Sequence, residues 1–244
     1  MVAVNNSGDV DDQNFLGIWS GLKFGPDVNA DFFGLWLRNI NSNDLSMLTF
    51  GVNGNLQLND FTIETELAVQ TGQMDKAQDI AANLFALNGS YTFSQLPVKP
   101  GIAAGIDRLS GDDNRFDNDN TVFNTLFATN HKYYGMMDYF INIPLHTYGL
   151  GLNDLHFGLS SVPCECLKLS LTFHHFRSTE EVTWIDGTTM NVFGNELDFL
   201  VDYKYNAHVN FQGGAAVFLP GDIFKQINGN DNSLFFYLST SVKL

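Results

Sequence analysis

The sequence predicts an all-β protein, an antiparallel transmembrane β-barrel of about 11–12 strands. Three observations support this: apolar and polar residues alternate along most of the chain, the alternating runs are about 9–12 residues long, and aromatic residues gather at their ends. Globular strands usually have about 5–6 residues, whereas a tilted strand needs about 9–11 to cross a bilayer. Aromatic girdles at both interfaces are typical of outer-membrane barrels.

Alternation is clearest in residues 61–70, where four apolar side chains take one face and Glu64, Glu66 and Gln70 take the other. The same pattern recurs in three later segments: residues 166–173, 196–205 and 234–244. Applied along the chain, it predicts strands near residues 15–24, 32–40, 45–57, 60–71, 82–94, 100–110, 152–161, 166–177, 193–205, 207–218 and 233–244. Residues 133–143 are a candidate twelfth strand.

The connections between these strands alternate in length, as expected for a barrel with short periplasmic turns and long outer loops. Short turns are expected at residues 24–31, 58–60, 95–99, 162–165 and around 206. Long polar connections are expected at residues 71–80, 110–151, 178–191 and 219–232. Only residues 41–44 break the pattern, being short where a long loop is expected.

Eleven antiparallel strands leave the first and the last pointing the same way, so they cannot close a barrel by antiparallel pairing. The chain also shows no signal peptide. We therefore expect residues 1–244 to form one β-barrel domain that is truncated at its N-terminus, begins in an outer loop at residues 1–14 and belongs to a larger barrel.

Composition excludes several functional classes. The chain has 27 acidic and 12 basic residues, a formal net charge of −15, which argues against nucleic-acid partners. No apolar run is long enough for a transmembrane helix. The two cysteines, Cys164 and Cys166, flank a single residue in a tight turn, and we expect free thiols or pairing to another molecule because a disulfide there would be strained.

One long block resembles the hallmark segment of the alginate-export family of outer-membrane barrels. It reads SGDDN at residues 110–114 and FNTLFATNHKYYGMMD at residues 123–138. Three shorter segments are also similar: NDLHFGL at residues 153–159, FLPGD at 218–222 and FYLST at 236–240. The resemblance runs from about residue 30 to the end and implies a location in the outer membrane of a Gram-negative-type bacterium. It also implies a barrel of about 18 strands, of which about 11 are present here.

The predicted function is that of a porin-like channel for passive passage of a polar solute, either a small molecule or an oligosaccharide, with membrane lipid around it. Loop 110–151 is expected to form a constriction or lid, anchored by His131. The polar strand faces supply the candidate lumen and selectivity residues: Glu64, Glu66, Asp107, Asp138, Asp154, Glu196, Asp198, Asp202, Lys23, Arg38, Lys168 and Lys204. Their acidic excess repels a polyanion such as alginate, so cations or neutral solutes are expected to pass.

No cofactor is expected except weakly bound calcium in residues 111–120, where Asp112, Asp113, Asp117 and Asp119 offer hard oxygen ligands. Their spacing does not match an EF-hand, and a solvated acidic loop shaped by Asx turns is the simpler interpretation. His174 and His175 point to opposite faces of one strand, so they are not expected to share a metal. No motif completes a Ser/His catalytic arrangement, and we do not expect an enzyme.

Two alternatives remain open at this point. One is a soluble or surface β-domain that binds glycans through its many aromatic residues and transports nothing. The other is a structural barrel plugged by its own loops.

Overall fold

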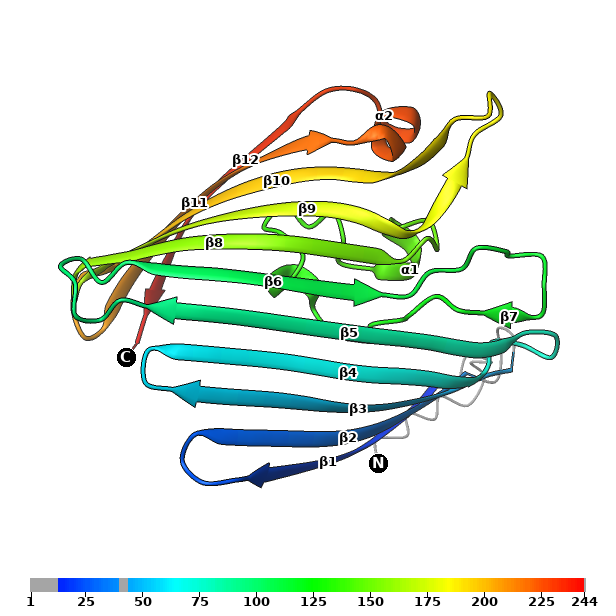
Figure 1. The fold of residues 1–244 in the computed structure, drawn as a ribbon, viewed down its shortest axis with the longest axis horizontal. Coiled ribbons are helices and arrows are strands. Elements are labelled where there is room, and N and C mark those ends of the chain that lie inside the picture. Colours follow the sequence, from blue (N-terminus) through cyan, green and yellow to red (C-terminus); the bar gives the residue numbers. More distant parts are fainter. Residues whose placement is uncertain (1–12, 40–43, 244) are drawn as a thin grey trace.

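The computed structural model describes residues 13–39 and 44–243, and its dominant feature is a single antiparallel sheet (Figure 1). The strands on its continuous path are β1 (Gln13–Lys23), β2 (Val28–Asn39), β3 (Leu45–Leu58), β4 (Phe61–Gln73), β5 (Asp79–Thr92), β6 (Gly101–Leu109), β8 (Leu152–Cys164), β9 (Leu167–Thr183), β10 (Thr189–Lys204), β11 (Val209–Pro220) and β12 (Ser233–Val242). Every strand pairs with its neighbours along this path. The predicted all-β antiparallel architecture is confirmed, and each predicted strand region contains a strand.

Four short elements complete the described chain. β7 (Asp119–Asn120), the 3-10 helix η1 (Asn130–Lys132) and α1 (Ile143–His146) lie between β6 and β8, while α2 (Asp222–Asn228) lies between β11 and β12. The twelfth strand predicted at residues 133–143 does not form. Gly135 and Asp138 both have positive φ there, at 81° and 60°, which lies outside the β region and turns the chain twice within four residues.

One end of the sheet has connections of two to eight residues, and the other end carries the two long loops, residues 110–151 and 221–232, as the sequence predicts. The predicted long connection at residues 71–80 is shorter, at residues 74–78. The loop predicted at residues 178–191 is shorter than expected and comprises only residues 184–188. β9 and β10 continue beyond the main ladder because two register shifts, between Met190 and Gly194, let the strands bend and go on pairing. Residues 1–12 of the outer loop predicted at residues 1–14 lie outside the described residues, and β1 begins at Gln13. Most of the connection predicted at residues 41–44 also lies outside them.

The sheet is a curved wall with β1 and β12 at its two edges (Figure 1). Within the described residues these two strands do not pair with each other. Because eleven strands alternate in direction along the path, β1 and β12 run the same way. None of the helices in the described residues is both long and apolar enough to span a membrane.

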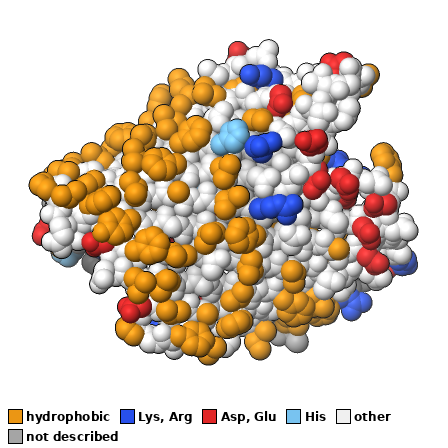
Figure 2. Space-filling view, viewed as in Figure 1, with side chains coloured by type: hydrophobic (Ala, Val, Ile, Leu, Met, Phe, Trp, Pro, Cys, Tyr) orange, Lys and Arg blue, Asp and Glu red, His pale blue; other side chains and the backbone are white. Residues whose placement is uncertain are grey.

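One face of the sheet exposes a broad apolar surface. Figure 2 shows apolar side chains across the strand region, with acidic side chains gathered where the long loops begin. By exposure and strand register, the large apolar residues of this face include Phe32, Phe50, Val69, Phe85, Ile102, Phe157, Phe173 and Phe199. A soluble domain rarely exposes so continuous an apolar surface, whereas a barrel presents it to lipid.

Cys164 and Cys166 form a disulfide across Glu165. The expectation of free thiols is therefore wrong. The tight turn between β8 and β9 brings the two Cα atoms to 5.2 Å, which is within the ordinary span of a disulfide.

Candidate functional site

The other face of the sheet, here called the inward face, is covered by loop 110–151. Figure 1 shows the part of this loop that carries α1 behind strands β6, β8 and β9. Phe140 is 1 % exposed and lies against three phenylalanine rings, with centroid distances of 4.6 Å to Phe176, 5.4 Å to Phe193 and 5.8 Å to Phe224. Burial of these aromatic rings is the main physical reason for the loop to dock on the sheet.

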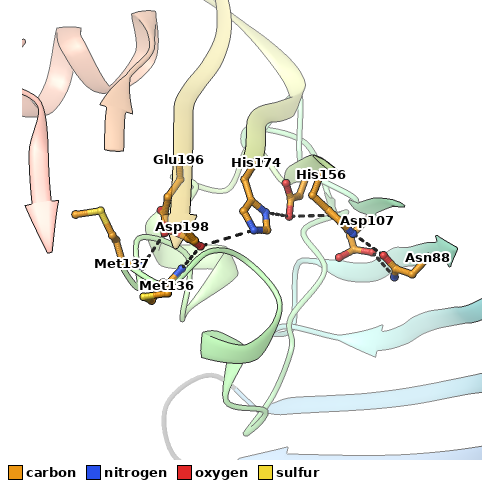
Figure 3. A network of polar contacts seen from close by, with 9 residues as sticks. Asn88, Asp107, Met136, Met137, His156, His174, Glu196 and Asp198 are labelled. Atoms are coloured by element: carbon orange, nitrogen blue, oxygen red, sulfur yellow. Dashed lines mark hydrogen bonds and ion pairs between the residues drawn. The ribbon is translucent and has the colours of Figure 1, made fainter. Parts of the chain in front are cut away.

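Two carboxylates of β10 hold the loop through its backbone. The N–H of Met136 donates to Oδ2 of Asp198 at 3.0 Å, and the N–H of Met137 donates to Oε1 of Glu196 at 2.8 Å (Figure 3). Gly135 precedes this pair with φ of 81°, and a Cβ built on it would lie 2.7 Å from the Glu196 carboxylate. The close approach of backbone and carboxylate therefore requires glycine at position 135.

A second anchor lies on β4. The amide of Gln70 donates from Nε2 to the carbonyl of Asn124 at 2.7 Å and accepts from the N–H of Asn124 at 2.8 Å. Gln70 is 2 % exposed. This paired contact fixes the loop to the wall 54 residues away in sequence.

His131, the predicted loop anchor, lies within the loop and contacts another loop residue. Its Nδ1 is 2.6 Å from Oδ1 of Asp138, and both side chains are about half exposed. Asp138 was predicted to face the lumen from a strand, but it lies in the loop beside His131. Gln70, Glu196 and Asp198 are thus among the residues that join the loop to the wall, together with Thr179, whose hydroxyl donates to the carbonyl of Leu150, and Ser233, which accepts from Tyr139.

The strand register locates the other predicted lumen residues, because directly paired residues share a face. One row of pairs runs from Glu64 through Asn88, Gly105, His156 and His174 to Glu196. The next row contains Glu66, Asp107 and Asp154, and alternation puts Asp198, Asp202, Lys168 and Lys204 on the same face. These residues all belong to the inward face.

Arg38 is an exception, and its predicted placement is wrong. It pairs with Ser46, while its neighbour Leu37 pairs with Met47 and is buried on the inward side. Arg38 therefore shares the outer face with Phe32. Apolar residues occupy both faces of β2, so alternation alone does not identify its polar side.

A histidine–aspartate cluster lies on the inward face of β8 and β9, and sequence reasoning missed it. Nδ1 of His174 is 2.8 Å from Oδ2 of Asp154, and Nδ1 of His156 is 3.5 Å from the same oxygen. Nε2 of His174 lies 3.9 Å from Oδ2 of Asp198, so the cluster adjoins the loop anchor (Figure 3). The available signal was Asp154 and His156 at a spacing of two on one strand.

The four predicted calcium ligands are not brought together. Asp112 and Asp117 accept backbone N–H groups two residues further on, at 2.9 and 3.0 Å, as in Asx turns. Within the described residues, the acidic and histidine side chains that converge as a group of three are Asp154, His156 and His174. The geometry at residues 111–120 is that of a loop shaped by its own turns.

Above the docked part of the loop, a cleft of about 530 Å³ opens between the loop and the ends of strands β3 to β5. Met47 and Ile80 line its wall side, while Arg115, Asn124 and Tyr148 line its loop side.

Tyr134 is a buried tyrosine of the loop, 6 % exposed. Burial raises the pKa of its hydroxyl well above the ordinary value, and the carboxylate of Asp107 raises it further.

The long antiparallel strands, the apolar outer face and the polar inward face together define a porin-type β-barrel protein of the bacterial outer membrane, as predicted. The family model described as alginate export matches residues 11–237, and the chain belongs to this family. Porin-type barrels typically perform no catalysis. No curated protein sequence matches the chain.

Three solved structures of porin barrels are similar in fold. They are OccK5 (OpdH) from Pseudomonas aeruginosa, with 14 % identity and a TM-score of 0.52, OccK8 (OprE) from the same organism, with 16 % and 0.53, and a variant of OccD1 (OprD), with 14 % and 0.56. The matches cover 99 %, 99 % and 94 % of this chain, but only 60 %, 62 % and 60 % of the respective porin chains. The chain therefore spans about three fifths of the length of these barrels.

Proposed function

We propose that this protein is the wall and constriction of an outer-membrane channel for passive passage of a polar solute. The observation that carries the proposal is the docking of loop 110–151 on the inward face, through Gln70, Glu196, Asp198 and the ring of Phe140. A folded loop on the lumen side narrows the passage, and the side chains it leaves uncovered set which solutes pass.

We propose further that residues 1–244 act as a single β-barrel domain within a larger barrel. Its lumen wall is acidic: the predicted lumen residues on the inward face include seven carboxylates and three lysines. They are Glu64, Glu66, Asp107, Asp154, Glu196, Asp198 and Asp202, with Lys23, Lys168 and Lys204. A confined acidic wall concentrates cations and repels polyanions, because low-dielectric walls focus the field.

The charge of the lumen wall indicates which class of solute passes. The family description refers to alginate, a polyanion that calls for a basic lumen. The acidic excess supports a preference for cations or neutral polar solutes in the part of the lumen that this chain forms.

The reversal potential of the protein in a planar bilayer under a salt gradient tests the proposal. We expect a potential of the sign that marks cation preference, reduced when Glu64 and Glu66 are both replaced by glutamine. Anion selectivity would contradict the charge argument while leaving a channel role intact.

A plugged structural barrel is the second candidate, and the tight aromatic packing of Phe140 favours it. The same bilayer experiment separates the two functions. Absence of conductance for the wild-type protein, with conductance appearing once the loop is released, would identify a plug.

A further inference from the structure

The histidine–aspartate cluster is built by the pairing of β8 with β9. His156 and His174 are direct register partners, and Asp154 lies two residues before His156 on the same face. Asp154 is fully buried, and the side chain of His174 is 8 % exposed. The side chain of His156 is 16 % exposed, which leaves the cluster an opening toward the lumen.

The hydrogen bonds around His156 determine which of its nitrogens carries a proton. Nδ2 of Asn88 donates to Oδ1 of Asp107 at 3.3 Å, which orients the amide so that its Oδ1 accepts from Nε2 of His156 at 2.6 Å. The proton is therefore on Nε2, and Nδ1 of His156 presents a lone pair. That lone pair faces Oδ2 of Asp154, another acceptor, at 3.5 Å.

Two buried atoms of this cluster have no hydrogen-bond partner: Oδ1 of Asp154 and Nδ1 of His156. Two acceptors that face each other away from water are destabilising unless a proton or a cation lies between them. Three further carboxylates adjoin the cluster, those of Asp107, Glu196 and Asp198. Asp198 lies 3.9 Å from Nε2 of His174, and within the described residues none of these three carboxylates forms an ion pair with a lysine or arginine.

We propose that Asp154, His156 and His174 bind a divalent transition-metal ion, zinc, on the lumen wall. The ligands are the Asp154 carboxylate and the Nδ1 atoms of the two histidines. Two imidazoles and one carboxylate suit zinc, whereas calcium and magnesium take oxygen ligands. This inference is independent of the proposed channel function, because it concerns binding and not conduction.

The distances fit a tetrahedral ion after small side-chain movements. The three ligand atoms lie within 4.8 Å of one another, and the spacing between ligands of a tetrahedral zinc site is about 3.4 Å for bonds of about 2.1 Å. The gap of 3.5 Å between His156 Nδ1 and Asp154 Oδ2 already matches this value.

The outer nitrogen of His156 has an oxygen acceptor, as in known zinc sites, and that of His174 lies near a carboxylate. Nε2 of His156 donates to Asn88, and Nε2 of His174 faces Oδ2 of Asp198 at 3.9 Å. Asp198 also accepts the N–H of Met136. Zinc would thus lie next to Asp198, the carboxylate that receives the docked loop.

Titration calorimetry with zinc chloride tests the proposal on untagged full-length protein, folded in detergent and treated with a chelator. We expect one zinc ion per chain. His156→Ala and His174→Ala should each weaken binding by at least about 100-fold, and Asn88→Ala by roughly 10- to 100-fold. The matched control is His175→Ala, because His175 is next to His174 but contacts Asn195 on the outer face.

Cobalt substitution keeps the test decisive if a variant fails to fold. Wild-type protein loaded with Co²⁺ should show the visible absorption of a tetrahedral site, which zinc should displace. A wild-type protein that takes up neither ion at one per chain would overturn the proposal. Equal loss of binding in His175→Ala and His174→Ala would overturn it as well.

Discussion

The backbone N–H of Met137 donates to Oε1 of Glu196 at 2.8 Å, joining positions 59 residues apart. This bond connects the long loop to β10 at a buried carboxylate of the inward face. Together with the bond from Met136 to Asp198, it makes an acidic pair of the wall the receptor for the loop backbone. Two of the predicted lumen residues therefore also position the loop on the inward face.

Replacement of Glu196 by alanine should release the loop. Alanine leaves the backbone N–H of Met137 without its acceptor, which costs about 1–3 kcal/mol, so the undocked fraction should rise roughly 5- to 150-fold. Single-channel conductance and limited proteolysis of residues 110–151 measure the release. Glu196→Gln retains the acceptor oxygen and should remain docked.

Glu64→Ala is the matched control for this variant. Glu64 lies in the same row of register partners but is exposed and far from the loop anchor. It should change ion selectivity without exposing the loop to protease. If Glu64→Ala and Glu196→Ala open the loop equally, the anchor has been wrongly identified.

Gly135→Ala should also displace the loop, for a steric reason. Alanine at a positive φ costs about 1–2 kcal/mol, and here its Cβ would also lie 2.7 Å from the Glu196 carboxylate. Gly187 has a similar φ of 85° with no atom within 4 Å of an added Cβ. Gly187→Ala should therefore leave proteolysis of the loop unchanged, and a comparable effect of both substitutions would point to backbone strain alone.

Phe140→Ala should weaken docking by about 3–5 kcal/mol, because it removes a buried ring from the contact with Phe176 and Phe193. Phe116 lies in the same loop but is 99 % exposed, so Phe116→Ala should change docking by less than about 0.5 kcal/mol. Protease protection of the loop, compared between the two variants, checks this. Retained protection in Phe140→Ala would show that the polar anchors hold the loop by themselves.

Local alternation was sufficient to predict the strands and most of their inward residues, but contacts between distant segments were not predictable from it. Asp154 and His156 share a face by simple period, yet their meeting with His174 depends on the register of β8 against β9. His174 and His175 do point to opposite faces, as predicted, and His174 instead meets a histidine of the neighbouring strand.

The two misplaced lumen residues have different physical causes. β2 carries apolar side chains on both faces, so nothing local assigns Arg38 to the outer one. Asp138 was assigned to a strand face because no local signal shows that the loop turns at Gly135 and again at Asp138. Docking of the loop depends on rings from β9 and β10, which lie far away in sequence.

Docking of the loop should weaken at high pH because of Tyr134. Burial raises the pKa of its hydroxyl in the docked loop, whereas in an undocked loop the hydroxyl has an ordinary pKa of about 10. Docking is therefore at full strength below about pH 10 and is progressively lost above it, as the undocked loop releases a proton that the docked loop retains. Tyr134→Phe should remove this dependence, and Tyr133→Phe, at a half-exposed ring, should preserve it. Protease protection of the loop measured between pH 8 and pH 11 tests the prediction, and an unchanged pH profile in Tyr134→Phe would assign the dependence to another group.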